Sequence, residues 1–187
     1  MAEKPILMND EMVRAILDGH KTQTRRPMKP QPTDIRRSPF VQSGLEDVHG
    51  YELRPRYWPG DRLWVKETVY VQGCLGLPLG ERQPTHYAAD IMCRDEVEDY
   101  TCKPSIHMPR WASRITLGVT EVRAERVQDI STGNVVAEGF ADLIAAGLGA
   151  TEHFDQFYRL WDSIYAKRGL GIEENPWVWV YTFKRRP

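Results

Sequence analysis

A short helix predicted over residues 9–18 runs into the segment Gly19-His20-Lys21-Thr22-Gln23-Thr24-Arg25-Arg26. A glycine directly after a helix favours a left-handed cap and a sharp change of direction. The lysine, the threonine hydroxyls and the two guanidinium groups behind this turn can converge on one anionic or hydroxyl-bearing ligand. Lysine is the cation whose pKa responds most to burial, whereas arginine stays charged. The segment therefore predicts a binding site, or a site for acid–base chemistry.

The rest of the chain favours strands over helices. Strands are predicted from β-branched and aromatic residues over residues 5–8, 62–71, 86–89, 114–128 and 176–184. Further helices are predicted over residues 130–138 and 151–168, each followed by a glycine. Prolines and a lack of periodicity predict mainly irregular excursions between these elements.

The order of these elements predicts an α+β protein. Several strands, few helices and no alternation of strand and helix favour a small mixed or antiparallel β-barrel with flanking helices. A length of 187 residues suits one domain that carries large insertions. We therefore expect a single domain over residues 1–187, with insertions at about 27–56 and 73–112.

Composition limits the possible partners. The net charge is −1, so attraction to nucleic acid requires a local basic patch. The three cysteines include no C-x-x-C pair, and the spacing of Cys93, Cys102 and His107 matches no common zinc site. Residues 1–8 lack a signal-peptide pattern, and no apolar run reaches the roughly 20 residues that span a bilayer. We expect a cytoplasmic protein without metal, cofactor or membrane partner.

A basic stretch follows the turn, with only Asp34 as a counter-charge between residues 21 and 37. Its cations are Lys21, Arg25, Arg26, Lys29, Arg36 and Arg37. Cations among prolines, with little apolar content, predict a surface for phosphates, and a solvated loop is the alternative. Trp58 and Trp111 lie beside predicted loops and are candidates for stacking on bases. Arg110 precedes Trp111 in a polar loop that can reach the site.

The pattern Gly19, Lys21, Thr24 and Arg26 after a short helix resembles the signature of the ASCH domain, a branch of the PUA-like β-barrel superfamily. Three later blocks agree in order: Pro59-Gly60-Asp61 before a strand, a strand with a short helix over residues 114–139, and the closing strand over residues 176–184. The chain is similar to the larger ASCH proteins that phage and prophage genomes encode. The resemblance implies a PUA-like β-barrel.

One branch of the ASCH family is an amidohydrolase that removes the acetyl group from N4-acetylcytidine nucleosides. The resemblance implies that Lys21 is a proton acceptor, Thr24 a nucleophile and Glu138 a proton donor. These roles are chemically consistent, because a threonine hydroxyl needs a neighbouring base and a lysine becomes one when desolvation lowers its pKa. The leaving amine then needs a proton from a carboxylic acid. Arg25 stands where that branch carries an apolar residue, and Arg26 would hold the site.

Two other functions stay open for the same residues. In a non-catalytic RNA-binding module, Lys21, Arg25, Arg26 and the basic stretch would bind phosphates. In a ribonuclease for single-stranded RNA, Lys21 and the arginines would stabilise the charge of a phosphorane. The expected partner is a nucleoside or single-stranded RNA in each case.

Overall fold

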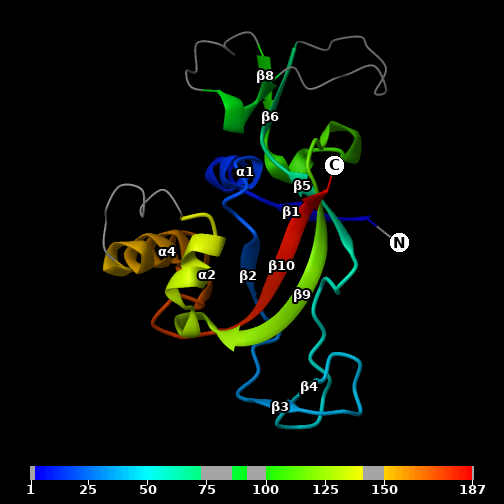
Figure 1. Ribbon diagram of the computed structural model, residues 1–187, viewed down its shortest axis with the longest axis vertical. Coiled ribbons are helices and arrows are strands. Elements are labelled where there is room, and N and C mark those ends of the chain that lie inside the picture. The colour runs from blue at the N-terminus through cyan, green and yellow to red at the C-terminus, as the bar shows by residue number, and fades with distance from the viewer. Residues whose placement is uncertain (1–2, 73–85, 92–99, 141–149, 187) are drawn as a thin grey trace. The chain divides into compact units, whose positions relative to one another are not determined.

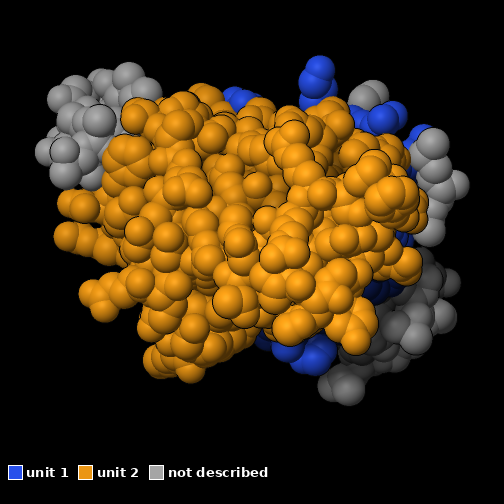
Figure 2. Space-filling view, turned by 90° about the horizontal axis from the view of Figure 1, so that it is seen from below, with its two compact units in different colours: residues 1–19, 61–118, 184–187 blue, residues 20–60, 119–183 orange. Residues whose placement is uncertain are grey.

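The computed structural model describes residues 3–72, 86–91, 100–140 and 150–186 (Figure 1). The chain divides into two compact units, each assembled from separate segments (Figure 2). Unit 1 contains residues 1–19, 61–118 and 184–187, and unit 2 contains residues 20–60 and 119–183. The single domain expected from the sequence stays a prediction.

Unit 1 contains part of a mixed sheet. Its strands are β1 (Glu3–Leu7), β5 (Arg62–Lys66) and the first residues of β9 (Thr116–Arg126). β1 pairs with β5 in parallel, and β5 pairs with β9 in antiparallel fashion. This mixed pairing agrees with the α+β class expected from the sequence.

The predicted first helix is present as α1 (Asp10–Leu17). The side chain of Asn9 caps it by accepting a hydrogen bond from the backbone N–H of Met12, and Val13 is buried. Gly19 follows with φ +81°, a left-handed conformation that favours glycine. The predicted cap and turn are both confirmed.

In unit 1, the described part of the second predicted insertion forms a small antiparallel sheet with the strand that precedes it and adds three short helical turns. The sheet has the order β7-β6-β8 and is formed by β6 (Val69–Gln72), β7 (His86–Tyr87) and β8 (Tyr100–Lys103). The 3₁₀ turns are η1 (Ala88–Asp90), η3 (Ser105–His107) and η4 (Arg110–Ala112). Residues 73–85 and 92–99 of this insertion lie outside the described part of the chain.

The strand predicted over residues 62–71 is divided in two at Glu67. This carboxylate is fully buried, and Nε and Nη2 of Arg114 each donate a hydrogen bond to it at 3.0 Å. Arg114 also binds Asp90 and lies over the ring of Tyr87, with 3.9 Å to the centroid. Arg114 thus supplies the counter-charge that a buried carboxylate requires.

Unit 2 contains the other part of the mixed sheet, with strand order β9-β10-β2. β10 (Trp177–Arg186) pairs in antiparallel fashion with β2 (Gln23–Pro27). The first insertion folds into a short hairpin of β3 (Ile35–Arg37) and β4 (Leu45–Asp47), where the sequence predicted mainly irregular structure. Three-residue strands are too short for a periodic signal.

Helices cover one face of β10 in unit 2. They are α2 (Thr132–Ala137) and α4 (Ala150–Tyr165), with the 3₁₀ turns η5 (Val127–Asp129) and η6 (Ala166–Arg168). Their shared core comprises Val127, Ile130, Val135, Phe157, Trp161, Tyr165, Val178 and Val180. On the opposite face of β10, Tyr181 packs edge-on against Tyr57, with 5.1 Å between ring centroids. The strand predicted over residues 176–184 is confirmed as β10.

The α+β class and the mixed sheet are confirmed. Among the described residues, hydrogen bonds do not close this sheet into a barrel. Among the described residues, β1 pairs only with β5 and β2 only with β10. A closed barrel would require a further pairing at these edges. In the described part of the chain, no helix is long and apolar enough to span a membrane.

We predict that Phe157→Ala lowers the free energy of unfolding by about 3 to 5 kcal/mol, because it leaves a cavity in the unit 2 core. Phe157 packs against Trp161, Phe140 and Tyr158. Urea unfolding followed by far-UV circular dichroism measures the loss. Arg159→Ala, an exposed change on the same helix, is the control and should stay within about 0.5 kcal/mol. Equal losses would contradict the assigned core.

Candidate functional site

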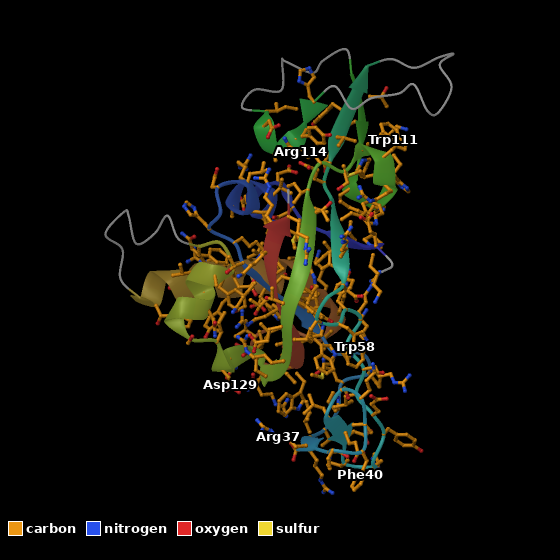
Figure 3. All side chains as sticks on the ribbon, turned by 45° about the vertical axis from the view of Figure 1, so that its right-hand side comes forward. Arg37, Phe40, Trp58, Trp111, Arg114 and Asp129 are labelled. Atoms are coloured by element: carbon orange, nitrogen blue, oxygen red, sulfur yellow. The ribbon has the colours of Figure 1, made fainter. Side chains whose placement is uncertain are left out.

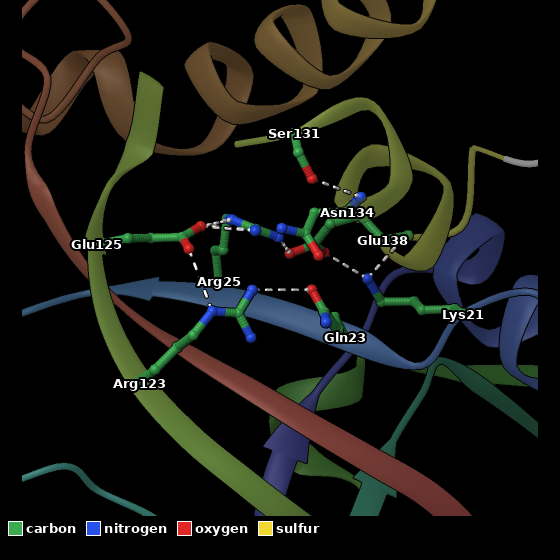
Figure 4. Close-up of polar contacts among 8 residues, drawn as sticks. All are labelled: Lys21, Gln23, Arg25, Arg123, Glu125, Ser131, Asn134 and Glu138. Carbon is green, nitrogen blue, oxygen red and sulfur yellow. Dashed lines mark hydrogen bonds and ion pairs between the residues drawn. The ribbon is translucent and has the colours of Figure 1, made fainter. Parts of the chain in front are cut away.

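The loop before β2 and the end of α2 bring a lysine and a glutamate into direct contact (Figure 4). Nζ of Lys21 donates one hydrogen bond to Oε2 of Glu138 and another to the backbone carbonyl oxygen of Glu138, both at 2.7 Å. The side chain of Lys21 is 0% exposed and that of Glu138 4%. A buried ammonium group requires such a counter-charge, because burial removes its hydration.

Arg25 holds the same carboxylate from β2. Its Nη1 donates to Oε1 of Glu138 at 2.8 Å. Its Nε donates to Oε1 of Glu125 on β9 at 2.8 Å, and its Nη2 lies 2.6 Å from the same oxygen. Arg123 donates to the other oxygen of Glu125 at 3.3 Å. Both Glu138 oxygens therefore contact a buried cation, and Arg25 connects two carboxylates.

Local sequence positions Glu138 at this point. Ser131 caps the start of α2, and Glu138 is its C-terminal cap residue. Gly139 then turns the chain away with φ +107°. The backbone N–H of Thr22 donates to the carbonyl of Ala137 at 2.8 Å and holds the Lys21 loop against the helix end. The last carbonyl groups of the helix, which have no partner within the helix, thus accept hydrogen bonds from the Lys21 loop.

Thr24 lies on the other face of β2 from Arg25. Side chains alternate along a strand, and Thr24 is paired with Tyr181 while Arg25 is paired with Val180. Thr24 is buried. Within the described residues, Nζ of Lys21 donates to Glu138 alone, so the Thr24 hydroxyl forms no hydrogen bond with it in this structure.

Arg26 shares the Thr24 face of β2 and reaches an aromatic hydroxyl. Its Nη1 donates to the Tyr165 hydroxyl at 3.2 Å. Burial opposes its charge, but the Tyr165 hydroxyl and the Glu138 carboxylate raise the pKa of Arg26. Burial raises the pKa of nearby Tyr181 to about 12, so its hydroxyl stays protonated at neutral pH. Arg26 is therefore a permanent cation near the neutral hydroxyl of Tyr181.

The buried surroundings of Lys21 favour its neutral form more strongly than bulk water would. Burial has the largest effect and lowers the pKa of Lys21 below its ordinary value. The positive charges of Arg26 and Arg25 act in the same direction, while Glu138 opposes them. A lysine with a lowered pKa can accept a proton, which an exposed lysine rarely does near neutral pH.

The cluster carries a surplus of positive charge. Lys21, Arg25, Arg26 and Arg123 lie around two carboxylates, those of Glu125 and Glu138. Such a surplus in a poorly hydrated environment attracts anionic or strongly polar groups. The arrangement can bind a phosphate or polarise a carbonyl.

The remaining predicted binding residues are divided between the units. Lys29, Arg36 and Arg37 are exposed in unit 2, where Trp58 is half-buried (Figure 3).

Arg110 and Trp111 belong to η4 of unit 1. Arg110 forms an ion pair with Glu3 at 2.6 Å, and Trp111 is 47% exposed. The contacts of Arg110 therefore belong to unit 1.

Glu125 and Tyr165 were not anticipated from the sequence. Glu125 has a role only because β9 lies beside β10 in the sheet. Tyr165 has one only because α4 packs against β10. Neither pairing leaves a local pattern. Of the cysteines, Cys102 is exposed and free, and Cys74 and Cys93 lie outside the described residues. Among the described residues, no group of three or more His, Cys, Asp or Glu side chains is placed to hold a metal ion.

No family model matches the sequence, and no curated protein matches it. Two solved structures are similar in fold. One is a protein from Enterococcus faecalis V583 described as DUF984, with 10% identity and a TM-score of 0.47, covering 99% of this chain and 81% of that chain. The other is an ASCH domain from Lactobacillus crispatus JV V101, with 15% identity and a TM-score of 0.42, covering 98% and 79%.

We predict that Glu138→Gln lowers the free energy of unfolding by about 3 to 5 kcal/mol, because Lys21 and Arg25 lose a buried counter-charge. Lys21→Met should cost less, since it removes the buried charge and keeps a side chain of similar length. Urea unfolding of both variants measures the difference. The exposed change Glu173→Gln is the matched control and should have little effect. A Glu138→Gln variant as stable as this control would contradict the cluster.

Proposed function

We propose that the chain is an ASCH-type protein that acts on nucleosides or RNA, and that it hydrolyses the amide of N4-acylated cytidine. The observation that carries the proposal is the buried contact between Lys21 and Glu138 at 2.7 Å, with the pKa of Lys21 lowered. A base and a proton carrier in contact are what amide hydrolysis needs. The resemblance of residues 19–26 to the ASCH signature supplies the substrate class.

In the proposed reaction, the Thr24 hydroxyl attacks the acyl carbonyl carbon and neutral Lys21 takes its proton. The C–N4 bond of the tetrahedral intermediate then breaks. The proton passes from Lys21 through Glu138 to the leaving amine, and water hydrolyses the acyl-threonine to release the acid. Arg25 would position Glu138, and Arg26 would stabilise negative charge on the carbonyl oxygen.

The role of the buried Thr24 hydroxyl is directly testable. Catalytic hydrogen bonds often form only when substrate is bound. A nucleophilic role for Thr24 therefore does not require a hydrogen bond between its hydroxyl and Lys21 in this structure. A hydroxyl with no catalytic role could be removed without loss of activity.

A second function, a non-catalytic RNA-binding module, is favoured by a different observation. Arg36 and Arg37 are exposed, and within the described residues neither forms an ion pair. Cations of this kind are available for phosphates. The surplus charge around Lys21 equally suits a ribonuclease, so RNA cleavage is measured in the same experiment.

We predict that the protein releases acetate from N4-acetylcytidine, and that Lys21→Met and Thr24→Val each reduce the rate by about 10²- to 10⁴-fold. Thr24→Val removes the hydroxyl and keeps the shape of the side chain. Acetate release and the length of a labelled single-stranded RNA are followed in parallel. Circular dichroism checks that each variant is folded, and Arg168→Ala, an exposed change, is the control. Acetate release that persists in Thr24→Val would exclude the proposed nucleophile.

We predict that acetate release rises with pH through the lowered pKa of Lys21 and then reaches a plateau. The sign follows from the mechanism: the neutral amine is the active form, and its fraction grows as pH rises. Because the pKa is lowered, this rise lies below the ordinary lysine value of 10.5. A rate that falls with pH over the same range would argue against Lys21 as the base.

A further inference from the structure

The β3–β4 hairpin segment, residues 29–54, carries two aromatic side chains that are almost fully exposed. Phe40, labelled in Figure 3, follows β3. It is 93% exposed, and Tyr51, which follows β4, is 72% exposed. Single exposed apolar residues are common on protein surfaces. Here two rings belong to one short hairpin that also carries exposed arginines. The hairpin is therefore a candidate interaction surface.

The hairpin is held together by its own hydrogen bonds. The backbone N–H of Ser38 donates to the carbonyl of Gly44 at 2.9 Å. The chain then returns alongside β4, where Leu53 N–H donates to the Leu45 carbonyl at 2.9 Å and Leu53 is buried. Phe40 and Tyr51 are thus presented by a folded segment, which lowers the entropy that binding would cost.

The four carboxylates of the hairpin segment each accept a hydrogen bond within it. The exposed Asp34 accepts the backbone N–H of Ile35 at 2.8 Å. Glu46 accepts a hydrogen bond from the Ser38 hydroxyl at 2.7 Å. Asp47 accepts the backbone N–H groups of His49 and Tyr51, each at 2.9 Å. Glu52 accepts the backbone N–H of Ser43 at 3.0 Å and pairs with Arg54.

Arg36 and Arg37 contrast with these acids. Both are exposed on β3, and neither has an ion pair or hydrogen bond of its side chain within the described residues. The hairpin therefore presents two unpaired guanidinium groups, one on each face of β3, together with two exposed rings. This combination matches single-stranded nucleic acid, whose bases stack on aromatic faces and whose phosphates attract arginine.

We propose that the hairpin segment binds single-stranded nucleic acid, with bases stacked on Phe40 and Tyr51 and phosphates held by Arg36 and Arg37. The inference deepens the proposed function and rests on it for the substrate class, because it names a polymer as the partner. The chain passes from β2, which carries Arg25 and Arg26, directly into this segment.

The test is fluorescence anisotropy of the full chain with a labelled single strand of about 15 nucleotides, long enough for one such surface. Matching RNA and DNA strands are both measured, because stacking and phosphate contacts are common to both. Phe40→Ala/Tyr51→Ala should weaken binding about tenfold or more. All four side chains are exposed, so the variants should fold, and circular dichroism checks this.

Salt dependence tests the arginines separately. Each lost phosphate contact should reduce the slope of log affinity against log salt by about 0.7, so Arg36→Ala/Arg37→Ala should reduce it by about 1.4. The matched control is Lys167→Ala/Arg168→Ala, which removes two adjacent exposed cations from η6. Its slope should stay unchanged. An equal reduction in this control would overturn the assignment to the hairpin.

A leucine variant separates stacking from a merely apolar contact. Phe40→Leu/Tyr51→Leu keeps apolar surface and removes the ring faces, so it should bind almost as weakly as the alanine variant. Full affinity in the leucine variant would overturn the proposal and favour a protein partner. Absence of saturable binding by the unaltered chain to either strand would overturn it as well.

The two proposals can fail separately. Hairpin-dependent binding without acetate release would refute the hydrolase and leave the nucleic-acid surface standing. Acetate release without hairpin-dependent binding would refute the surface and leave the hydrolase standing.

Discussion

Burial of three charged side chains is the constraint around which unit 2 is organised. Removing Lys21, Arg25 and Glu138 from water costs several kcal/mol for each ion, and this is offset only by close contacts with good geometry. Glu138 meets the requirement with both carboxylate oxygens and its backbone carbonyl. The loop after Gly19, strand β2 and the end of α2 must therefore hold their positions together.

Such a cluster is a poor way to gain stability, because well-packed apolar residues often replace buried ion pairs without loss. Perturbed charges gathered at one place are, however, what catalysis and anion binding use. The surrounding architecture suits this interpretation. A capped helix and a paired strand fix the groups, while the apolar core beneath α4 supplies the stability that the charges do not.

Local patterns predicted much of this fold, and long-range pairing determined the rest. Helix α4, strand β10 and the turn at Gly19 depend on neighbouring residues, so they were visible in the sequence. Lys21 and Glu138 were linked by family resemblance, not by any pattern of their own. Glu125 could not be found, because its role depends on β9 reaching Arg25. The exposed Phe40 was missed because aromatic residues are usually buried.

The double contact of Arg25 also restricts how this protein can evolve. Replacing Arg25 by an apolar residue would leave the largely buried Glu125 without its main counter-charge, and replacing Glu125 would remove one of the two carboxylates that Arg25 contacts. Either single step passes through a less stable protein. Lineages that exchange this arginine for an apolar side chain are therefore expected to change Glu125 as well. The two positions are therefore expected to change together, although 100 residues separate them in the sequence.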